Sequence, residues 1–129
     1  MKKTPYVTNV EEKALTNENF RQVLHTTDHL QLVAMSLDSG EDIGEEVHEL
    51  DQFLRIEKGS GKAVLDGREY DIADGFAVLV PAGTRHNIIN TGRAAMKLYT
   101  LYGPPDHREG VIHKTKADAL ADTTDHYEG

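Results

Sequence analysis

Short apolar runs separated by turn residues follow one another through most of this chain. About eight or nine such runs, at intervals of roughly 8–12 residues, are typical of an all-β sandwich or barrel. Helical periodicity is almost absent from this part of the chain. The pattern therefore predicts an all-β fold, and 129 residues suffice for a single domain with its own core. The expected strands cover residues 20–25, 29–37, 52–57, 62–65, 68–72, 76–80, 86–91 and 95–102.

Three local features sharpen this prediction. Asp66-Gly67 lies between two β-type runs and indicates a tight hairpin, because glycine readily adopts the positive φ that such a turn needs. Pro81 ends the run 76–80, which we expect to be a buried strand. The run 29–37 has apolar residues on both faces, which indicates packing inside a sandwich or against a second chain.

Charge excludes several classes of partner. The chain has 14 Lys and Arg against 22 Asp and Glu, which gives a net charge of -8. Nucleic acids and anionic membranes bind basic faces, so neither is an expected partner. The basic start is not followed by the apolar run of a signal peptide, and no stretch approaches the ~20 apolar residues of a membrane span. A cytoplasmic location is therefore expected.

Two polar clusters lie far apart in the sequence but would meet in a small barrel. Glu46 and His48 are two residues apart, so in a strand both side chains point to one face. Gln52 follows His48 at an even spacing, and His86 lies beyond the turn that Pro81 begins. The chain has no cysteine, so any metal must use His, carboxylate or amide ligands. Two imidazoles, a carboxylate and an amide oxygen suit a divalent transition metal.

Fixed spacings in two stretches carry a resemblance to a known family. The defined positions of a first motif are occupied by Gly40, Glu46, His48, Gln52 and Gly59. The defined positions of a second motif are occupied by Gly75, Pro81, Gly83, His86 and Asn90. These motifs resemble those of the cupin superfamily, whose members are small double-stranded β-helix, or jelly-roll, barrels. The second motif matches at every defined position, and the first keeps its spacing throughout.

The resemblance implies a metal site. In cupins, two His and one Glu of the first motif and the His of the second hold the metal. By position, the candidate ligands here are Glu46, His48, Gln52 and His86. The chain departs from the family at two of them, since Glu46 replaces the usual first His and Gln52 the usual Glu. Gln52 is either a direct ligand or a hydrogen-bonding partner of a ligand or metal-bound water. Such a set suits Mn, Fe, Ni, Co or Zn.

The resemblance also sets expectations for organisation and function. The chain looks like a small stand-alone bacterial cupin, with a core at about 30–102, an N-terminal arm at 1–29 and a tail at 103–129 in which Thr115 caps a short helix. Small cupins of one domain usually dimerise, so a homodimer is expected. The expected function is a metal-dependent isomerase, lyase or dioxygenase acting on a small polar molecule, such as a sugar phosphate or an oxo-acid. The alternative is a module that binds or senses a small ligand or a metal without turnover.

The remaining polar residues are expected to have structural roles. Asn90 should fix a turn. Tyr99 and Tyr102 line the barrel mouth or simply pack in the sheet. Outside the motifs, the histidines are expected on the surface, with His107 or His113 folded over a cavity as the alternative. These surface candidates are His25, His29, His107, His113 and His126.

Overall fold

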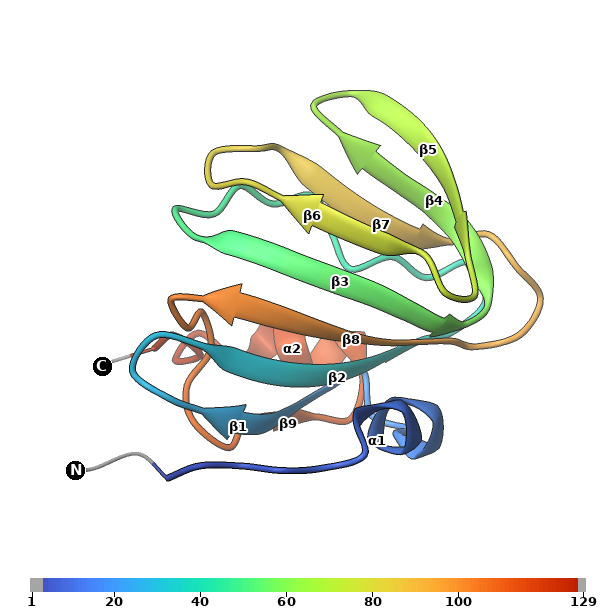
Figure 1. Cartoon of the computed structure of the whole chain (residues 1–129). Helices are drawn as coiled ribbons and strands as arrows, with labels where there is room; N and C mark the ends of the chain where they lie inside the picture. The colour runs from blue at the N-terminus through green and yellow to red at the C-terminus, as the bar shows by residue number, and fades with distance from the viewer. Residues whose placement is uncertain (1–3, 128–129) are drawn as a thin grey trace.

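The computed structural model describes residues 4–127 and consists of two antiparallel β-sheets that face each other, with a short helix near each end of the chain (Figure 1). One sheet has the order β6-β3-β8-β2-β1-β9 and the other β5-β4-β7. The predicted all-β jelly-roll class is confirmed. The elements are α1 Val10–Thr16, β1 Arg21–Thr26, β2 Gln31–Leu37, β3 Asp51–Lys58, β4 Ser60–Leu65, β5 Arg68–Ala73, β6 Ala77–Val80, β7 His86–Asn90, β8 Met96–Gly103, β9 Ile112–His113 and α2 Lys116–Ala121.

The inner faces of the two sheets form the core, and one end of that core is polar. In β7 and β8 every second residue is buried, as expected for strands with one face on a core. The apolar end includes Ile56, Met96 and Leu98. The polar end, where β3 and β7 begin and β8 ends, includes Gln52, His86 and Tyr102. The candidate ligands therefore lie at one end of the barrel.

β4 and β5 form the predicted hairpin. Asp66 and Gly67 have φ values of 50° and 82°. A type I′ turn needs positive φ at both central positions, which is why Asp-Gly is favoured there. The two strands pair without a register shift, from Ser60 opposite Ala73 to Leu65 opposite Arg68.

The arm and the tail each add a strand to the larger sheet. β1 comes from the arm and pairs with β2, and β9 comes from the tail and pairs with β1, so both extend the larger sheet. The Thr115 side chain accepts a hydrogen bond from the Asp118 N–H at the start of α2, which confirms the predicted cap. Neither described helix is long and apolar enough to cross a membrane. The cytoplasmic location stays a prediction.

β2 is covered on both faces by the chain itself. Its core side is apolar, and Ala34 and Ser36 on the opposite side are buried as well. Lys97 reaches across Ser36 to the carbonyl oxygen of Asn17, the residue that ends α1. The core on one side and the segment around α1 on the other therefore explain the two-sided apolar pattern, and a partner chain is not needed to explain it.

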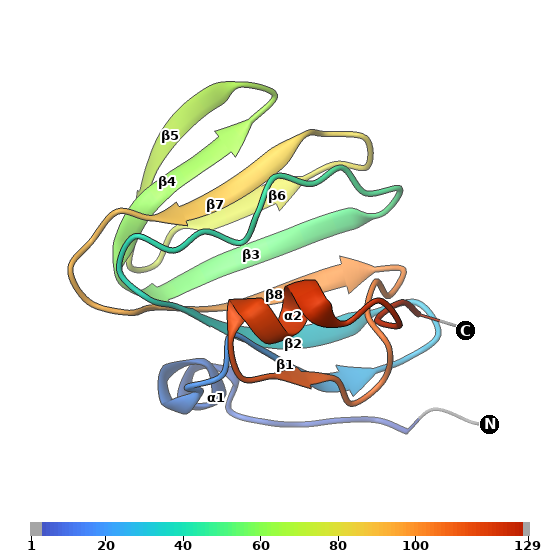
Figure 2. The same cartoon turned by 180° about the vertical axis from the view of Figure 1, so that it is seen from behind.

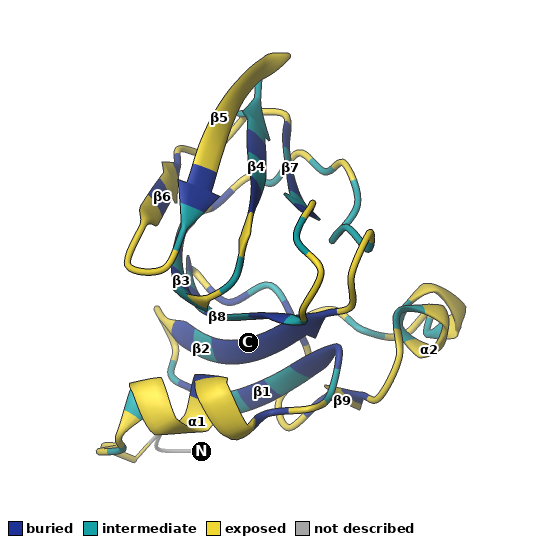
Figure 3. Ribbon diagram, turned by 90° about the vertical axis from the view of Figure 1, so that its right-hand side faces the viewer, coloured by how far each residue is buried: buried dark blue, intermediate teal, exposed yellow. Residues whose placement is uncertain are grey.

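The expectation for the run 76–80 is wrong. Only alternate residues of β6 are buried, and Phe76 and Leu79 are 49% and 70% exposed. β6 is an outer strand of the larger sheet, and Figure 3 shows exposed residues along it. An apolar sequence alone does not reveal which of its faces another layer covers.

We predict that the protein is a homodimer in solution. The outer side of β3, β6 and β8 carries an apolar groove whose lining includes Phe53, Leu79 and Leu101, and a second copy would remove this surface from water. Light scattering during size-exclusion chromatography should give twice the mass of one chain. The mass of a single chain across the micromolar range contradicts the expectation.

Candidate metal site

Backbone pairing brings the two motif stretches together at the polar end. Residues 41–46 run along β7, with bridges between Asp42 and Ile89 and between Glu46 and His86 (Figure 2). The Glu46 N–H donates to the His86 carbonyl, and the His86 N–H donates to the Glu46 carbonyl, both at 2.9 Å. Residues that are forty positions apart in the sequence thereby become neighbours.

The turn between β6 and β7 fixes the loop that carries His48. The Gly83 N–H donates to the His48 carbonyl at 2.8 Å, and the Thr84 N–H donates to the Pro81 carbonyl at 3.1 Å. Gly83 has φ 86°, which glycine adopts without strain. The Pro and Gly of the second motif therefore hold His48 beside the strand that carries His86.

The predicted ligands line one small cavity at this end. Its volume is about 10 Å³, which is room for a single water molecule or ion. Gln52 and His86 are buried, whereas Glu46 is partly exposed. The structure thus brings together the residues that the motifs selected, and their role as metal ligands stays a prediction. The lining includes Glu46, His48, Gln52, Leu54, His86 and Tyr102.

Glu46 and His48 form a hydrogen-bonded pair beside this cavity. Glu46 Oε2 lies 2.9 Å from His48 Nε2. Burial alone would raise the pKa of Glu46, but the hydrogen bond with His48 and the fields of His48, Arg21 and His86 together lower it. The hydrogen bond with Glu46 raises the pKa of His48 against the effect of burial. Adjacent ligands at ~2.1 Å from one ion lie about 3 Å apart, so an ion could replace the shared proton with little movement.

His86 and Gln52 each present an atom suited to a metal. His86 Nδ1–H donates to the Thr84 carbonyl at 2.8 Å, and because a carbonyl only accepts, the neutral ring carries its lone pair at Nε2. Gln52 Nε2 donates to Thr100 Oγ1 at 3.0 Å. Gln52 Oε1 is buried without a hydrogen-bond partner among the described residues. An orphaned buried acceptor costs about 1–3 kcal/mol, and a metal or its bound water would remove that cost. The donor set fits a divalent transition metal.

Asp106 is a further candidate that sequence analysis missed. It comes from the tail after β8, and its Oδ1 lies 3.7 Å from His48 Nδ1. Glu46, His48 and Asp106 offer ligand atoms that all lie within 4.8 Å of one another. Asp106 follows a proline pair and matches neither motif, so no spacing in the sequence indicates its place.

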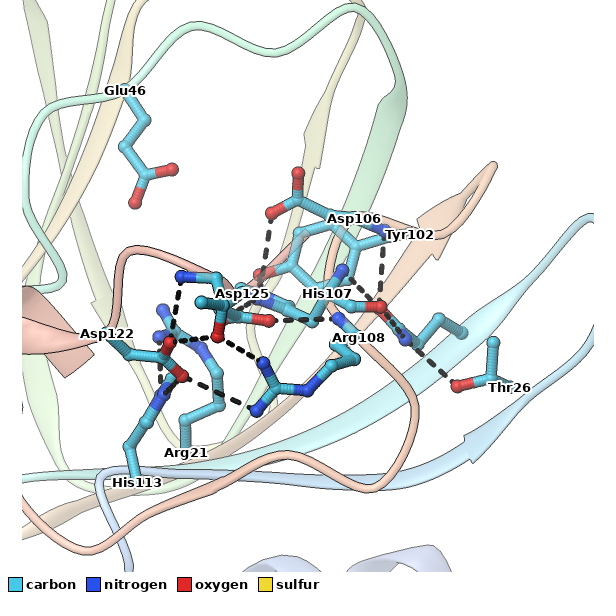
Figure 4. A network of polar contacts seen from close by, with 12 residues as sticks. Arg21, Thr26, Glu46, Tyr102, Asp106, His107, Arg108, His113, Asp122 and Asp125 are labelled. Carbon is cyan, nitrogen blue, oxygen red and sulfur yellow. Dashed lines mark hydrogen bonds and ion pairs between the residues drawn. The ribbon is translucent and has the colours of Figure 1, made fainter. Parts of the chain in front are cut away.

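The tail covers the polar end, and two of its histidines are buried there. His107 and His113 are 6% and 4% exposed, so the expectation that they lie on the surface is wrong. His107 Nδ1 lies 2.8 Å from Asp125 Oδ2, and its Nε2 lies 3.3 Å from the Tyr102 hydroxyl (Figure 4). His113 Nε2 lies 3.0 Å from Asp122 Oδ2. A carboxylate from later in the tail anchors each imidazole.

A larger cavity adjoins the small one and lies beneath the tail. Its volume is about 300 Å³, and it borders Glu46 and His48 as well as Asp106 and His107. His107 therefore lines a cavity, as the alternative for this residue anticipated. Burial raises the pKa of the Tyr102 phenol far above its usual value, so the hydroxyl stays protonated and can donate a hydrogen bond.

The roles expected for Asn90 and the tyrosines can be assigned. Asn90 is fully buried, and its amide bonds two backbone carbonyls and one backbone N–H, which confirms a turn-fixing role. Tyr102 points into the polar end, with its ring 6.1 Å from that of His48. Tyr99, three residues earlier, lies on the other face of β8 with its ring 6.3 Å from that of Phe53. The odd spacing of the two tyrosines in one strand explains this difference.

We predict that Asp125→Asn weakens the fold in a pH-dependent manner. Burial would raise the pKa of Asp125, but the hydrogen bond with His107 lowers it below the ordinary 3.8. A lowered folded pKa stabilises the fold fully above about pH 4, and the contribution is lost as pH falls through the folded value. At pH 7 the variant should lose about 1–3 kcal/mol of unfolding free energy, and the difference should shrink toward pH 2.

Denaturant titrations at the two pH values measure this effect. Asp71→Asn, which removes an exposed ion pair with Lys62, is the matched control and should change stability little. A deficit in Asp125→Asn that is the same in acid as at neutral pH would count against the anchoring role.

Comparison with known proteins agrees with the fold and the motifs. The Cupin domain family matches residues 33–102. The uncharacterized protein YrkC of Bacillus subtilis (strain 168) is 48% identical over 125 residues, which cover 91% of this chain and 67% of YrkC. The crystal structure of BH2720 from Bacillus halodurans is 46% identical with a TM-score of 0.89, covering 92% of this chain and 96% of that one. KdgF from Halomonas sp. is 23% identical with a TM-score of 0.62, over 69% and 79% of the two chains, and shares the fold. The chain belongs to the cupin family.

Proposed function

We propose that this cupin binds a divalent transition metal and is an enzyme that acts on a small polar molecule in the barrel. Glu46, His48, Gln52 and His86 would hold the metal, with Asp106 as a further ligand. When bound, the metal would polarise a substrate oxygen as a Lewis acid or provide a site for dioxygen. Mn, Fe, Ni, Co and Zn all suit this set. The observation that carries the proposal is the buried, unpartnered Gln52 oxygen in an ion-sized cavity lined by two imidazoles.

The residues around the larger cavity suit proton transfer to or from a ligand. Asp125 holds the His107 ring by Nδ1, which leaves Nε2 near the Tyr102 hydroxyl as the position where a proton can be accepted or released. The tail supplies Asp106, His107 and Asp125 to the wall of this cavity. Isomerase, lyase and dioxygenase chemistry are all compatible with these groups.

A second candidate function is binding or sensing without turnover. The observation that favours it is the amide at position 52, because a neutral oxygen is a weaker ligand than the carboxylate that is usual in cupins. A metal held loosely, or a small ligand held without a metal, would suit a module of this kind. The two candidates share the site and differ in whether the bound molecule is converted.

Elemental analysis followed by activity assays distinguishes the two functions. The protein is purified without an affinity tag, its metal content is measured, and turnover is tested on a panel of sugar phosphates and oxo-acids. Bound metal together with turnover supports the enzyme. Bound metal without turnover on any compound favours the module. A fully folded protein that holds no metal and cannot be loaded would overturn the metal proposal.

We predict that His48→Ala and His86→Ala each weaken metal binding by about 10-fold or more, because even residues that only orient metal ligands contribute that much. The readout is the metal content after dialysis against a competing chelator. His29→Ala, an exposed histidine in the turn before β2, is the matched control and should bind metal like the wild type. Full metal occupancy in both site variants contradicts the site.

We predict that Gln52→Glu strengthens metal binding by about 10-fold, because a carboxylate replaces a neutral oxygen at a buried position. The same variant should be less stable than the wild type without metal, since a buried carboxylate without a partner is costly. Chelator competition and thermal unfolding, each with and without metal, measure the two effects. Unchanged affinity together with unchanged metal-free stability would show that the side chain at position 52 does not face the metal.

A further inference from the structure

Arg21 is a buried cation that borders the larger cavity. It is 7% exposed and extends from β1 into the space beneath the tail (Figure 4). Its Nη1 donates to His113 Nδ1 at 3.2 Å. Its Nε is buried without a hydrogen-bond partner, and within residues 4–127 its guanidinium forms no ion pair with a carboxylate. A buried charge without a counter-ion is costly, so its presence needs an explanation.

Part of the Arg21 guanidinium remains available to a ligand. The hydrogen bond to His113 uses Nη1, and Nε is enclosed by the protein, which leaves Nη2 as the donor for a ligand in the cavity. The Phe20 ring lies against the face of the guanidinium, 5.2 Å from its central carbon. A ligand would therefore approach in the plane of the group. A guanidinium N–H in that plane forms a short, charge-assisted hydrogen bond with a carboxylate oxygen.

The acidic side chains around the cavity are paired with residues other than Arg21. Asp122 is connected to Arg21 only through His113, and it also lies 3.6 Å from Arg108. Lys116, the other cation that lines the cavity, is paired with Asp42. Each remaining carboxylate of the lining has a histidine beside it; these are Glu46, Asp106 and Asp125. Of the described cations that line the cavity, Arg21 alone lacks an acidic partner.

We infer that Arg21 binds a carboxylate group of the ligand, so that the cavity takes a small carboxylic acid. The inference rests on the proposed function, because the same cavity borders Glu46 and His48 of the metal site. A metal bound there would take up the charges of Glu46 and Asp106, and the positive charge of Arg21 would remain for the ligand. A volume of about 300 Å³ is at the small end of ligand sites.

A carboxylate fits this cavity better than a phosphate. A phosphate monoester carries close to two negative charges at neutral pH. It would face one guanidinium and the three aspartates Asp106, Asp122 and Asp125. A carboxylate carries a single negative charge, which the single positive charge of Arg21 balances.

The test compares acids with their own neutral amides. Short 2-hydroxy and 2-oxo acids, the primary amide of each acid, and a sugar phosphate are titrated by calorimetry into chelator-treated and metal-loaded protein. The wild type should bind at least one acid, and its amide about 10-fold or more weakly. Arg21→Gln should weaken binding of that acid by roughly 10- to 100-fold and leave binding of the amide unchanged. Arg68→Gln, which removes an exposed arginine of β5, is the matched control.

The outcomes separate this inference from the metal proposal. Acid preference that disappears in Arg21→Gln supports the inference even if the protein holds no metal. Arg21→Gln that retains metal and still prefers the acid overturns it, as does a wild type that binds amides or the sugar phosphate as tightly as the acids, or none of the compounds. If Arg21→Gln does not fold, Arg21→Lys takes its place, because lysine keeps the charge but lacks the planar guanidinium and should also bind the acid more weakly.

Discussion

The pair of backbone hydrogen bonds between Glu46 and His86 is the interaction on which the candidate site depends. It fixes which residue of the loop lies beside which residue of β7. A slip of one residue would turn His86 toward the outside of the barrel, because successive side chains of a strand point to opposite faces. The turn at Gly83 adds a third hydrogen bond, to the His48 carbonyl, so both imidazoles are placed by the backbone before any ligand binds.

Compared with the usual cupin site, Glu46 and Gln52 move the carboxylate from a buried position to a partly exposed one. Gln52 is 6% exposed, whereas the Glu46 side chain is 36% exposed. A carboxylate at position 46 is therefore easier to hydrate than one at position 52, and His48 stabilises it further. The neutral amide at position 52 avoids a buried charge when no metal is bound. Together these changes lower the cost of folding without metal, and the site keeps both oxygen and nitrogen donors.

Most of the barrel and the convergence of the four candidate ligands on one cavity could be predicted from the sequence, because each rests on local spacing. Strand alternation gives the inward face of β7, Asp66-Gly67 gives the hairpin, and two motifs give the cluster. The tail could not be predicted in this way. β9 has two residues, His107 lies in irregular backbone, and the carboxylates that anchor His107 and His113 follow α2. The role proposed for Arg21 could not be predicted either, because it depends on the lack of an acidic partner, which no sequence pattern indicates.

The most direct test of the account is a crystal structure of the metal-loaded protein in which anomalous scattering locates the ion. The account predicts one ion per chain in the cavity between β3, β7 and the 41–48 loop, bound to an imidazole nitrogen of His48 and to His86 Nε2 at ~2.0–2.2 Å. An ion held only by the tail, for example at His107 or His113, or a cavity that stays free of metal in a loaded crystal, would contradict it.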